Sequence, residues 1–229
     1  LLVFDRQESQ RRILITGGGT REPIDSVRFI GNMSSGRTAA LLADELSAAG
    51  HRVTWLGARD AVQPALAGEL DFFTSFSELG NRLKHLLGSG EYDVVIHVAA
   101  VSDFSVAGLE SEGSELNIPG GKLSSDTDLV LRLKRNPKLL DRLKDWSVNP
   151  GLQVIGFKLT DTRNTQLRLA AVRKQLDNSG VDAVVHNDLS DISETEHRFC
   201  FHRDGQEPET CEDSGELAMT INRLLETVS

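Results

Sequence analysis

The sequence is short of cysteine, aromatic residues and long hydrophobic runs, and each shortage excludes a class of protein. Two cysteines in 229 residues are too few for a disulfide scaffold or a four-ligand zinc site. The longest purely apolar runs span only a few residues, whereas a membrane helix needs ~20. The single tyrosine, Tyr92, is followed four residues later by Ile96, so the Tyr-x-x-x-Lys pair of a short-chain reductase is absent.

Basic residues are also in the minority. Lys and Arg number 25 against 34 Asp and Glu, which gives a net charge of −9 and a pI near 5.2. Because affinity for duplex nucleic acid depends on neutralising phosphates, we expect no nucleic-acid partner. The first eight residues lack a basic stretch followed by an apolar core, so we predict no signal peptide, no membrane association and a cytoplasmic location.

Short apolar runs alternate with amphipathic segments along most of the chain. The alternation predicts one domain over residues 1–229 with an α/β fold, a Rossmann-like doubly wound and mostly parallel sheet. Strands are expected at 11–16, 52–56, 70–73, 93–100, 129–134, 153–159 and 182–186, helices at 34–49, 76–87, 137–146, 165–179 and 214–227, and a hairpin at 197–210.

Two boundary predictions follow from individual residues. Serines in front of the 34–49 helix predict a side-chain cap, and Gly50 behind it predicts a glycine C-terminus. Residues 104–121 carry glycines, serines and acids without a period, so we predict a mobile flap there.

A glycine-rich loop follows the first predicted strand. Glycines let backbone N–H groups approach a phosphate closely, and adjacent hydroxyls add donors. The loop is not a dinucleotide fingerprint, because Glu22 occupies the third glycine position, and no Gly-Lys-Ser/Thr closes it as in a Walker A loop. It predicts either a nucleotide or phosphate ligand or a plain tight turn, and its candidate binding residues are Gly17, Gly18, Gly19 and Thr20.

A second candidate anion site precedes the first predicted helix. A helix N-terminus offers unpaired N–H groups and partial positive charge, both of which favour an anion. The alternative is an ordinary cap with solvated arginines. Two such sites on adjacent loops favour bound phosphates, and the residues of the second are Arg28, Asn32, Ser34, Ser35 and Gly36.

Further candidates follow later strands. Ligands of open α/β sheets bind outside the carboxyl ends of strands, where Ala99 and Ala100 offer a flat platform for a base. Asp103 is placed to face a ribose hydroxyl or a metal, or else to cap the next element. Lys122, after two glycines, suits a mobile charge that reaches phosphates, although a lone loop lysine is usually solvated. The remaining candidates are Phe157 and Lys158 at the end of a strand and Arg173 and Lys174 on the helix that follows.

Taken together and in this order, these segments resemble the phosphopantothenoylcysteine synthetases, the phosphopantothenate–cysteine ligases of coenzyme A biosynthesis. The resemblance runs from Ile13 to about Phe201 and is closest to the free-standing form, without the decarboxylase domain often fused ahead of it. Its motifs are Gly-Gly-Thr-Arg-Glu-Pro-Ile-Asp, Val-Arg-Phe-Ile-Gly-Asn-Met-Ser-Ser-Gly, Ala-Ala-Val-Ser-Asp-Phe, Gly-Lys-Leu-Ser-Ser, Arg-Asn-Pro, Gly-Phe-Lys-Leu and Asn-Asp.

The resemblance implies a two-step ligation. Together with the segment from 128–136 to 153–159, a dimerisation excursion that interrupts the β–α alternation, it also predicts a homodimer. The carboxylate of 4'-phosphopantothenate attacks the α-phosphorus of a nucleoside triphosphate bound with Mg²⁺, and the cysteine amine then displaces the nucleoside monophosphate. It also implies that Asn32 holds the reacting acyl group, that Lys122 contacts the triphosphate and that Asp103 binds the sugar. Ala99, Ala100 and Phe157 would frame the base through backbone groups, and no protein side chain is assigned to a metal.

The sequence also departs from the family pattern. Arg37 stands where a lysine is common, Leu123 and two serines replace a lysine-rich run, and Lys158 is typical of the free-standing forms. These departures bear on the nucleotide, for which we expect CTP, with ATP as the alternative.

Two other functions are weighed against the ligase. A Rossmann reductase that uses NAD(P) would need an acid at the end of the second strand, where none occurs before Asp60. A non-catalytic nucleotide-binding sensor is disfavoured by the presence of both Asn32 and Lys122.

Overall fold

The computed structural model describes residues 10–111, 114–116, 121–123, 126, 128–193 and 197–227. The strands are β1 Arg12–Gly17, β2 Arg21–Pro23, β3 Phe29–Gly31, β4 Arg52–Ala58, β5 Glu69–Phe73, β6 Val94–His97, β7 Phe104–Ser111, β8 Ser114–Glu115, β9 Val130–Arg135, β10 Gln153–Thr160, β11 Ala183–Asp188, β12 Phe199–His202 and β13 Glu209–Cys211. The helices are α1 Arg37–Ala48, α2 Phe76–Ser89, α3 Leu143–Trp146, α4 Thr165–Asn178 and α5 Ser214–Thr227, with 3₁₀ turns η1 Leu140–Arg142 and η2 Leu189–Asp191.

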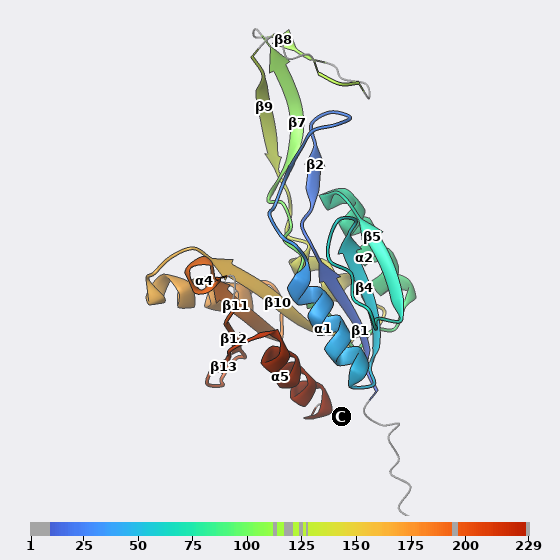
Figure 1. Ribbon diagram of the computed structural model, residues 1–229, viewed down its shortest axis with the longest axis vertical. Helices are drawn as coiled ribbons and strands as arrows, with labels where there is room; N and C mark the ends of the chain where they lie inside the picture. The colour runs from blue at the N-terminus through green and yellow to red at the C-terminus, as the bar shows by residue number, and fades with distance from the viewer. Residues whose placement is uncertain are drawn as a thin grey trace, which may run out of the picture.

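The central sheet has eight strands in the order β13-β12-β11-β10-β6-β1-β4-β5 (Figure 1). The six strands from β5 to β11 are parallel, and β12 and β13 add an antiparallel edge. From β1 the chain first builds outward through β4 and β5, then returns to β6 on the other side of β1. The sheet is therefore doubly wound, as the sequence predicts, and its switch point lies between β1 and β6.

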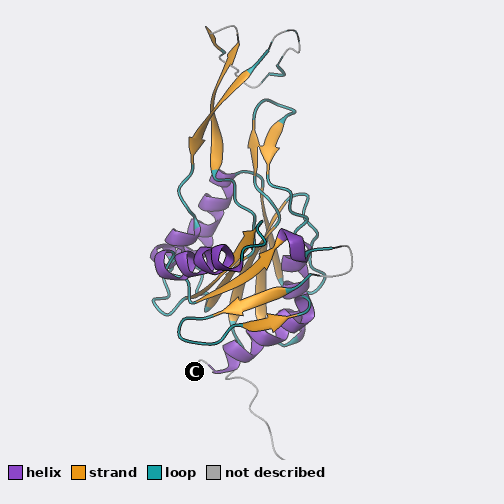
Figure 2. Cartoon of the chain, turned by 90° about the vertical axis from the view of Figure 1, so that its left-hand side faces the viewer, coloured by secondary structure: helices purple, strands orange, loops and turns teal. Residues whose placement is uncertain are grey.

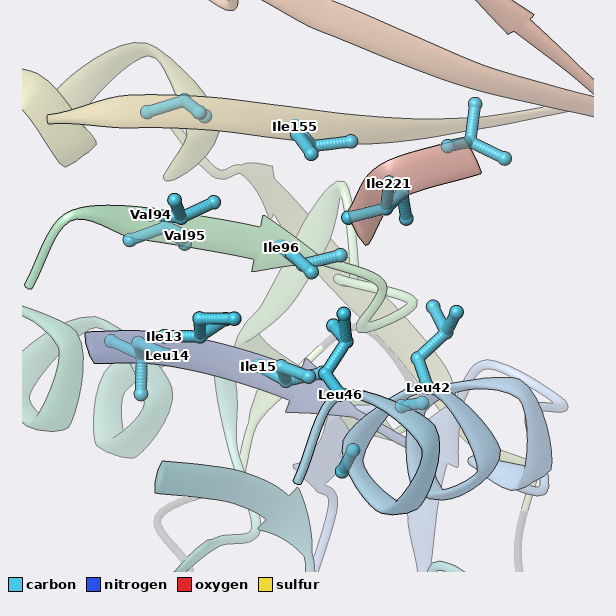
Figure 3. Packing of buried hydrophobic residues seen from close by; sticks show 14 of the residues in the cluster. Ile13, Leu14, Ile15, Leu42, Leu46, Val94, Val95, Ile96, Ile155 and Ile221 are labelled. Carbon is cyan, nitrogen blue, oxygen red and sulfur yellow. The ribbon is translucent and has the colours of Figure 1, made fainter. Parts of the chain in front are cut away.

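Helices cover both faces of the sheet, and the core lies between them and the strands (Figure 2). Helices α1 and α5 pack against each other, and α2 packs against α3. Ile15, Ile96 and Ile155 come from neighbouring strands; Ile15 lies beside Leu46 of α1, and Ile155 lies toward Ile221 of α5 (Figure 3). These strands are apolar over nearly every residue because both faces of a parallel sheet are buried. Among the described helices, none is long and apolar enough to span a membrane.

The helix predicted over 137–146 is wrong in its first half. Regular helix is confined to η1 and to the single turn α3, because the segment before them is bound to the loop after β6. The Asn136 N–H donates to the Asp103 carbonyl at 2.8 Å, and the Lys138 ammonium pairs with the Asp103 carboxylate. These contacts hold residues 136–138 extended beside residue 103.

The mobile flap predicted over 104–121 is also corrected. Residues 104–111 form β7, which pairs with β9 on one side and β8 on the other, and this three-stranded arm projects beyond one end of the sheet (Figure 1). Residues 112–113 and 117–120 of the predicted flap lie outside the described residues. A β-bulge between Val106 and Gly108 interrupts the in–out alternation of side chains along β7.

A small hairpin of β2 and β3 was not predicted and projects from the same end of the sheet as the arm (Figure 2). Its turn is closed by Asp25, whose carboxylate accepts the N–H groups of Val27 at 2.8 Å and Arg28 at 2.7 Å. The Arg21 guanidinium lies 4.4 Å from the centre of the Phe29 ring. The hairpin therefore presents Arg28 and leads directly to Asn32.

Candidate functional site

The loops that leave β1 and β6 lie side by side at the switch point. The Ala100 N–H donates to the Gly18 carbonyl at 2.8 Å, and the Thr20 N–H donates to the Ala100 carbonyl at 3.1 Å. The two strands thus stay paired for several residues beyond their ends, and the glycine-rich loop and the alanine platform form one surface. The structure brings together these two predicted segments, which lie about 80 residues apart in sequence.

The three glycines of the first loop are required by the packing of the protein itself. A Cβ on Gly17 would lie 2.6 Å from Ala39 Cβ, and one on Gly19 would lie 2.5 Å from the Asn32 carbonyl oxygen. Gly18 has φ +82°, which side chains rarely adopt. Close packing of α1 and of residue 32 therefore requires glycine in this loop, and the backbone of Asn32 lies directly against Gly19.

The predicted serine cap of α1 is wrong in its position. The N-cap is Gly36, in the left-handed conformation with φ 73°, and it has no side chain to cap the helix. The Ser35 hydroxyl accepts the Arg37 N–H at 3.4 Å. Gly36 packs closely on Gly18, because a Cβ there would lie 3.1 Å from Gly18 N. The Ser35 carbonyl accepts the Val62 N–H at 2.9 Å. The exposed Ser34 and Ser35 and the start of α1 adjoin the glycine loop.

The structure also brings the Lys122 segment to the β2–β3 turn. The Asp25 side chain is fully buried and accepts the Leu123 N–H at 3.1 Å, in addition to the two turn amides. The Val27 N–H, followed by the other bonded amides and the Arg28 guanidinium 3.4 Å away, lowers the pKa of Asp25. Through its bond to Leu123, Asp25 therefore holds the neighbouring, exposed Lys122 close to the turn that carries Arg28.

Asp103 lies at the base of the arm with its side chain partly exposed and paired with Lys138. Among the described residues, no group of three or more His, Cys, Asp or Glu is placed to hold a metal ion. Asp103 thus faces a cation of its own chain, and it is available to a sugar hydroxyl from its exposed side.

Phe157 and Lys158 lie level with the platform. Gly156 is in register with His97, so the two residues after it extend past the end of β6, beside residues 98 and 99. The Phe157 carbonyl accepts from Gln175 Nε2 at 3.3 Å, and its ring packs edge-on against Phe199. The backbone oxygen expected to frame a base is therefore also bonded within the protein.

Arg173 and Lys174 are not brought to this edge. Helix α4 runs from the carboxyl end of β10 back to the start of β11, and both residues lie in its second half. Arg173 Nη1 is 3.4 Å from an oxygen of Asp204, in the turn between β12 and β13. Because β12 is antiparallel to β11, that turn lies at the opposite edge of the sheet. We assign neither residue to the site.

A buried carboxylate that the sequence does not single out joins the site to the arm. Glu22 is 5% exposed, and its two oxygens accept the Phe76 N–H at 2.8 Å and the Ser105 hydroxyl at 2.7 Å. Asn136 approaches the same hydroxyl at 3.0 Å and donates to the Ser102 carbonyl at 3.0 Å. Glu22 and Asn136 stand in motifs of the sequence, but only the fold shows that β2, α2, β7 and β9 meet at them.

A doubly wound parallel sheet with a glycine-rich loop at its switch point defines a Rossmann-like α/β protein, the class in which ligands bind at this position. Within that class the chain belongs to the family described as DNA/pantothenate metabolism flavoprotein C-terminal domain, whose model matches residues 8–227.

Similar proteins extend this assignment. The chain is 34% identical over 187 residues to the coenzyme A biosynthesis bifunctional protein CoaBC of Thermococcus kodakarensis, covering 82% of this chain and 43% of that protein. It is 29% identical to human phosphopantothenate–cysteine ligase, covering 66% and 64%. The crystal structure of a DNA/pantothenate metabolism flavoprotein from Streptococcus pneumoniae superimposes with a TM-score of 0.85 at 29% identity, covering 96% of this chain and all of that one. The chain spans about half or less of the length of the CoaBC relatives that it matches.

Proposed function

We propose that the chain joins 4'-phosphopantothenate to cysteine through an acyl-nucleotide intermediate, with cleavage of a nucleoside triphosphate to the monophosphate and pyrophosphate. The observation that carries the proposal is the convergence of Asn32, the glycine-rich loop and the Ala99–Ala100 platform at the switch point. Family membership and the similarity to human phosphopantothenate–cysteine ligase support it.

The site supplies what the first step needs. Phosphoryl and nucleotidyl transfer depend on positioning and on neutralising charge at the phosphates. The start of α1, with its exposed serines, and the amides near Gly18 offer a place for the triphosphate. Lys122, held near Arg28 by Asp25, adds a cation. The substrate carboxylate then attacks the α-phosphorus, and pyrophosphate leaves.

The second step centres on Asn32. Its exposed side chain stands beside the glycine loop, where an amide N–H can donate to the acyl oxygen. Charge grows on that oxygen as the cysteine amine adds, so a donor placed there lowers the barrier. The amide bond forms, and the nucleoside monophosphate departs with the electron pair of the broken acyl–phosphate bond.

For the nucleotide we propose CTP, with ATP as the alternative, accompanied by Mg²⁺. The amides of Ala99 and Ala100 and the carbonyl of Ala100 are bonded within the protein, so these residues offer the base chiefly apolar surface. Mg²⁺ would be held chiefly by the phosphates of the nucleotide. We place the reaction in the cytoplasm, where the free thiols Cys200 and Cys211 would stay reduced.

The proposal is tested by pyrophosphate release. The protein is mixed with 4'-phosphopantothenate and CTP, ATP, GTP or UTP in parallel, with and without cysteine. We expect release with CTP above ATP, and release that depends on phosphopantothenate. Lys122→Gln should slow it roughly 30- to 1000-fold, equivalent to a lost contact of ~2–4 kcal/mol. Lys84→Gln, an exposed lysine on α2, is the matched control. No release with any nucleotide would refute the proposal.

A homodimer is the second part of the proposal, and the arm supports it. In the β7–β9 ribbon, Phe104, Val106, Leu109, Leu131 and Leu133 share one face. Phe104 is 50% exposed and Leu133 is 45% exposed, although a two-stranded ribbon is marginally stable unless its apolar face is covered. We propose that a second copy of the chain covers this face and brings the arms of both subunits near the two sites.

A further inference from the structure

The last residue of β6 is a buried histidine that pairs with a buried threonine of β1. Thr16 and His97 are in register on adjacent strands, and Thr16 Oγ1 lies 2.9 Å from His97 Nδ1. Thr16 is fully buried and His97 is 6% exposed. Burial lowers the pKa of His97 to about 4, so its imidazole is neutral near pH 7.

The same threonine oxygen receives a bond from the platform. The Ala99 N–H donates to Thr16 Oγ1 at 3.2 Å. A hydroxyl has one proton, and with the oxygen accepting from Ala99 that proton can be given to His97 Nδ1. The ring proton then resides on Nε2. In the other tautomer Nδ1 would donate to Thr16, and the hydroxyl proton would lose this acceptor.

A second threonine, four residues after Thr16, makes a similar contact. Thr20, also fully buried, accepts the Ser102 N–H on its Oγ1 at 2.8 Å. Together with the bond from Ala100 to Gly18, these contacts attach three amides of the 99–102 loop to β1 and the loop that follows it. Among the described contacts, no histidine accepts from the Thr20 hydroxyl as His97 does from that of Thr16. Of the two threonines, Thr16 is therefore the one whose hydroxyl proton has a defined direction.

We propose that Thr16 and His97 act together as positioning residues for the nucleotide: the imidazole orients the Thr16 hydroxyl, the hydroxyl holds the Ala99 amide, and the amide sets the platform on which the base lies. The effect on the nucleotide rests on the proposed function. The contacts among His97, Thr16 and Ala99 rest on the geometry of the protein alone. Neither side chain contacts substrate.

The experiment compares two pairs of variants. Thr16→Val removes the hydroxyl, and Thr16→Ser keeps it. His97→Leu removes the acceptor, and His97→Asn keeps one, since its side-chain oxygen reaches the position of Nδ1. Thermal unfolding of all four variants establishes which of them fold. If Thr16→Val or His97→Leu does not fold, Thr16→Ser and His97→Asn are still compared with wild type.

The first readout needs no ligand. Ring ¹⁵N shifts of wild-type His97 should report a proton on Nε2 and an acceptor at Nδ1, and hydrogen exchange at the Ala99 amide should be at least ~10-fold faster in Thr16→Val and His97→Leu than in Thr16→Ser and His97→Asn. A proton on Nδ1, or equal exchange in all four variants, overturns the arrangement even if the protein binds no nucleotide.

The second readout is steady-state kinetics with CTP or ATP. We expect Thr16→Val and His97→Leu to raise KM for the nucleotide ~10-fold with kcat changed far less, and the conservative variants to stay within ~2-fold of wild type. A fall in kcat at constant KM overturns the positioning role. If wild type itself shows no turnover, the proposed function fails while the ring and exchange measurements still decide the arrangement.

Discussion

Glu22 shows how one residue can hold several elements. Its carboxylate is buried without an ion-pair partner among its described contacts, and it accepts from the first residue of α2 and from Ser105 of β7. We expect Glu22→Ala to lower the free energy of unfolding by about 1–3 kcal/mol, because the Phe76 N–H would lose its acceptor and the Ser105 hydroxyl would keep only Asn136. Denaturant unfolding measures this change. The exposed Glu91→Ala should stay within ~0.5 kcal/mol, and a similar loss in both variants would contradict the role of Glu22.

His97 predicts how stability depends on pH. The folded protein keeps the ring neutral down to about pH 4, whereas the unfolded chain takes up a proton below about pH 6.5. The free energy of unfolding should therefore fall as the pH drops from 6.5 to 4, by up to ~1.4 kcal/mol per unit from this residue. Burial lowers the pKa values of His186 and His202 in the same direction.

The contribution of His97 is isolated by comparing wild type with His97→Asn in denaturant at pH 7, 6 and 5. The variant keeps the other histidines, so its stability should change less steeply with pH. If the free energy of unfolding changes equally with pH in the two proteins, the His97 ring takes up its proton in the folded protein as readily as in the unfolded chain, and its pKa is not lowered by burial.

Among the elements, the β2–β3 turn and the Lys122 segment depend on the two oxygens of Asp25. One oxygen accepts the two turn amides and the other accepts the Leu123 N–H. Asp25→Asn can keep its carbonyl toward the turn while its NH₂ group faces Leu123. We expect the Leu123 amide to exchange faster, with the Val27 and Arg28 amides nearly unchanged. In Asp25→Ala all three should exchange faster, and an unchanged Leu123 in both variants would exclude the tether.

The elements that the sequence predicts well are those whose signal is local. β1 and β6 are apolar runs with breaks at both ends, and α5 has its predicted bounds of 214–227. β7 was missed because its partner β9 begins 19 residues after it ends, and because its bulge interrupts the alternation. The serine cap failed because Gly36 packs on Gly18, a contact that depends on the tertiary fold.

The same distinction separates the site residues. The loops were found because glycines and strand ends mark them locally. Thr16, His97, Glu22 and Asp25 gave no such signal, since a threonine or histidine at a strand end is ordinary until its neighbours are known. Arg173 was placed at the site from its chemistry alone, and the direction of α4 takes it to the other edge.

For the whole molecule, the arm predicts an assembly. Light scattering at micromolar concentration should give twice the chain mass of 25.1 kDa. Leu133→Lys, on the apolar face of β9, should shift the protein to monomer, because a charge cannot be buried there without a partner. Val130→Lys is the control, since Val130 is 61% exposed on the opposite face of the same strand. A monomeric wild type would refute the dimer.

The position of β1 in the middle of the sheet has a consequence during synthesis. Its first neighbour, β4, follows within 40 residues, but its other neighbour pairs through residues 81 positions later, as Thr16 does with His97. At ~5–20 residues per second, a ribosome exposes the open edge of β1 for about 4–16 s before β6 is made. A nascent chain stalled before residue 94 should therefore bind chaperones and resist folding, and synthesis of β6 should cover this edge of β1.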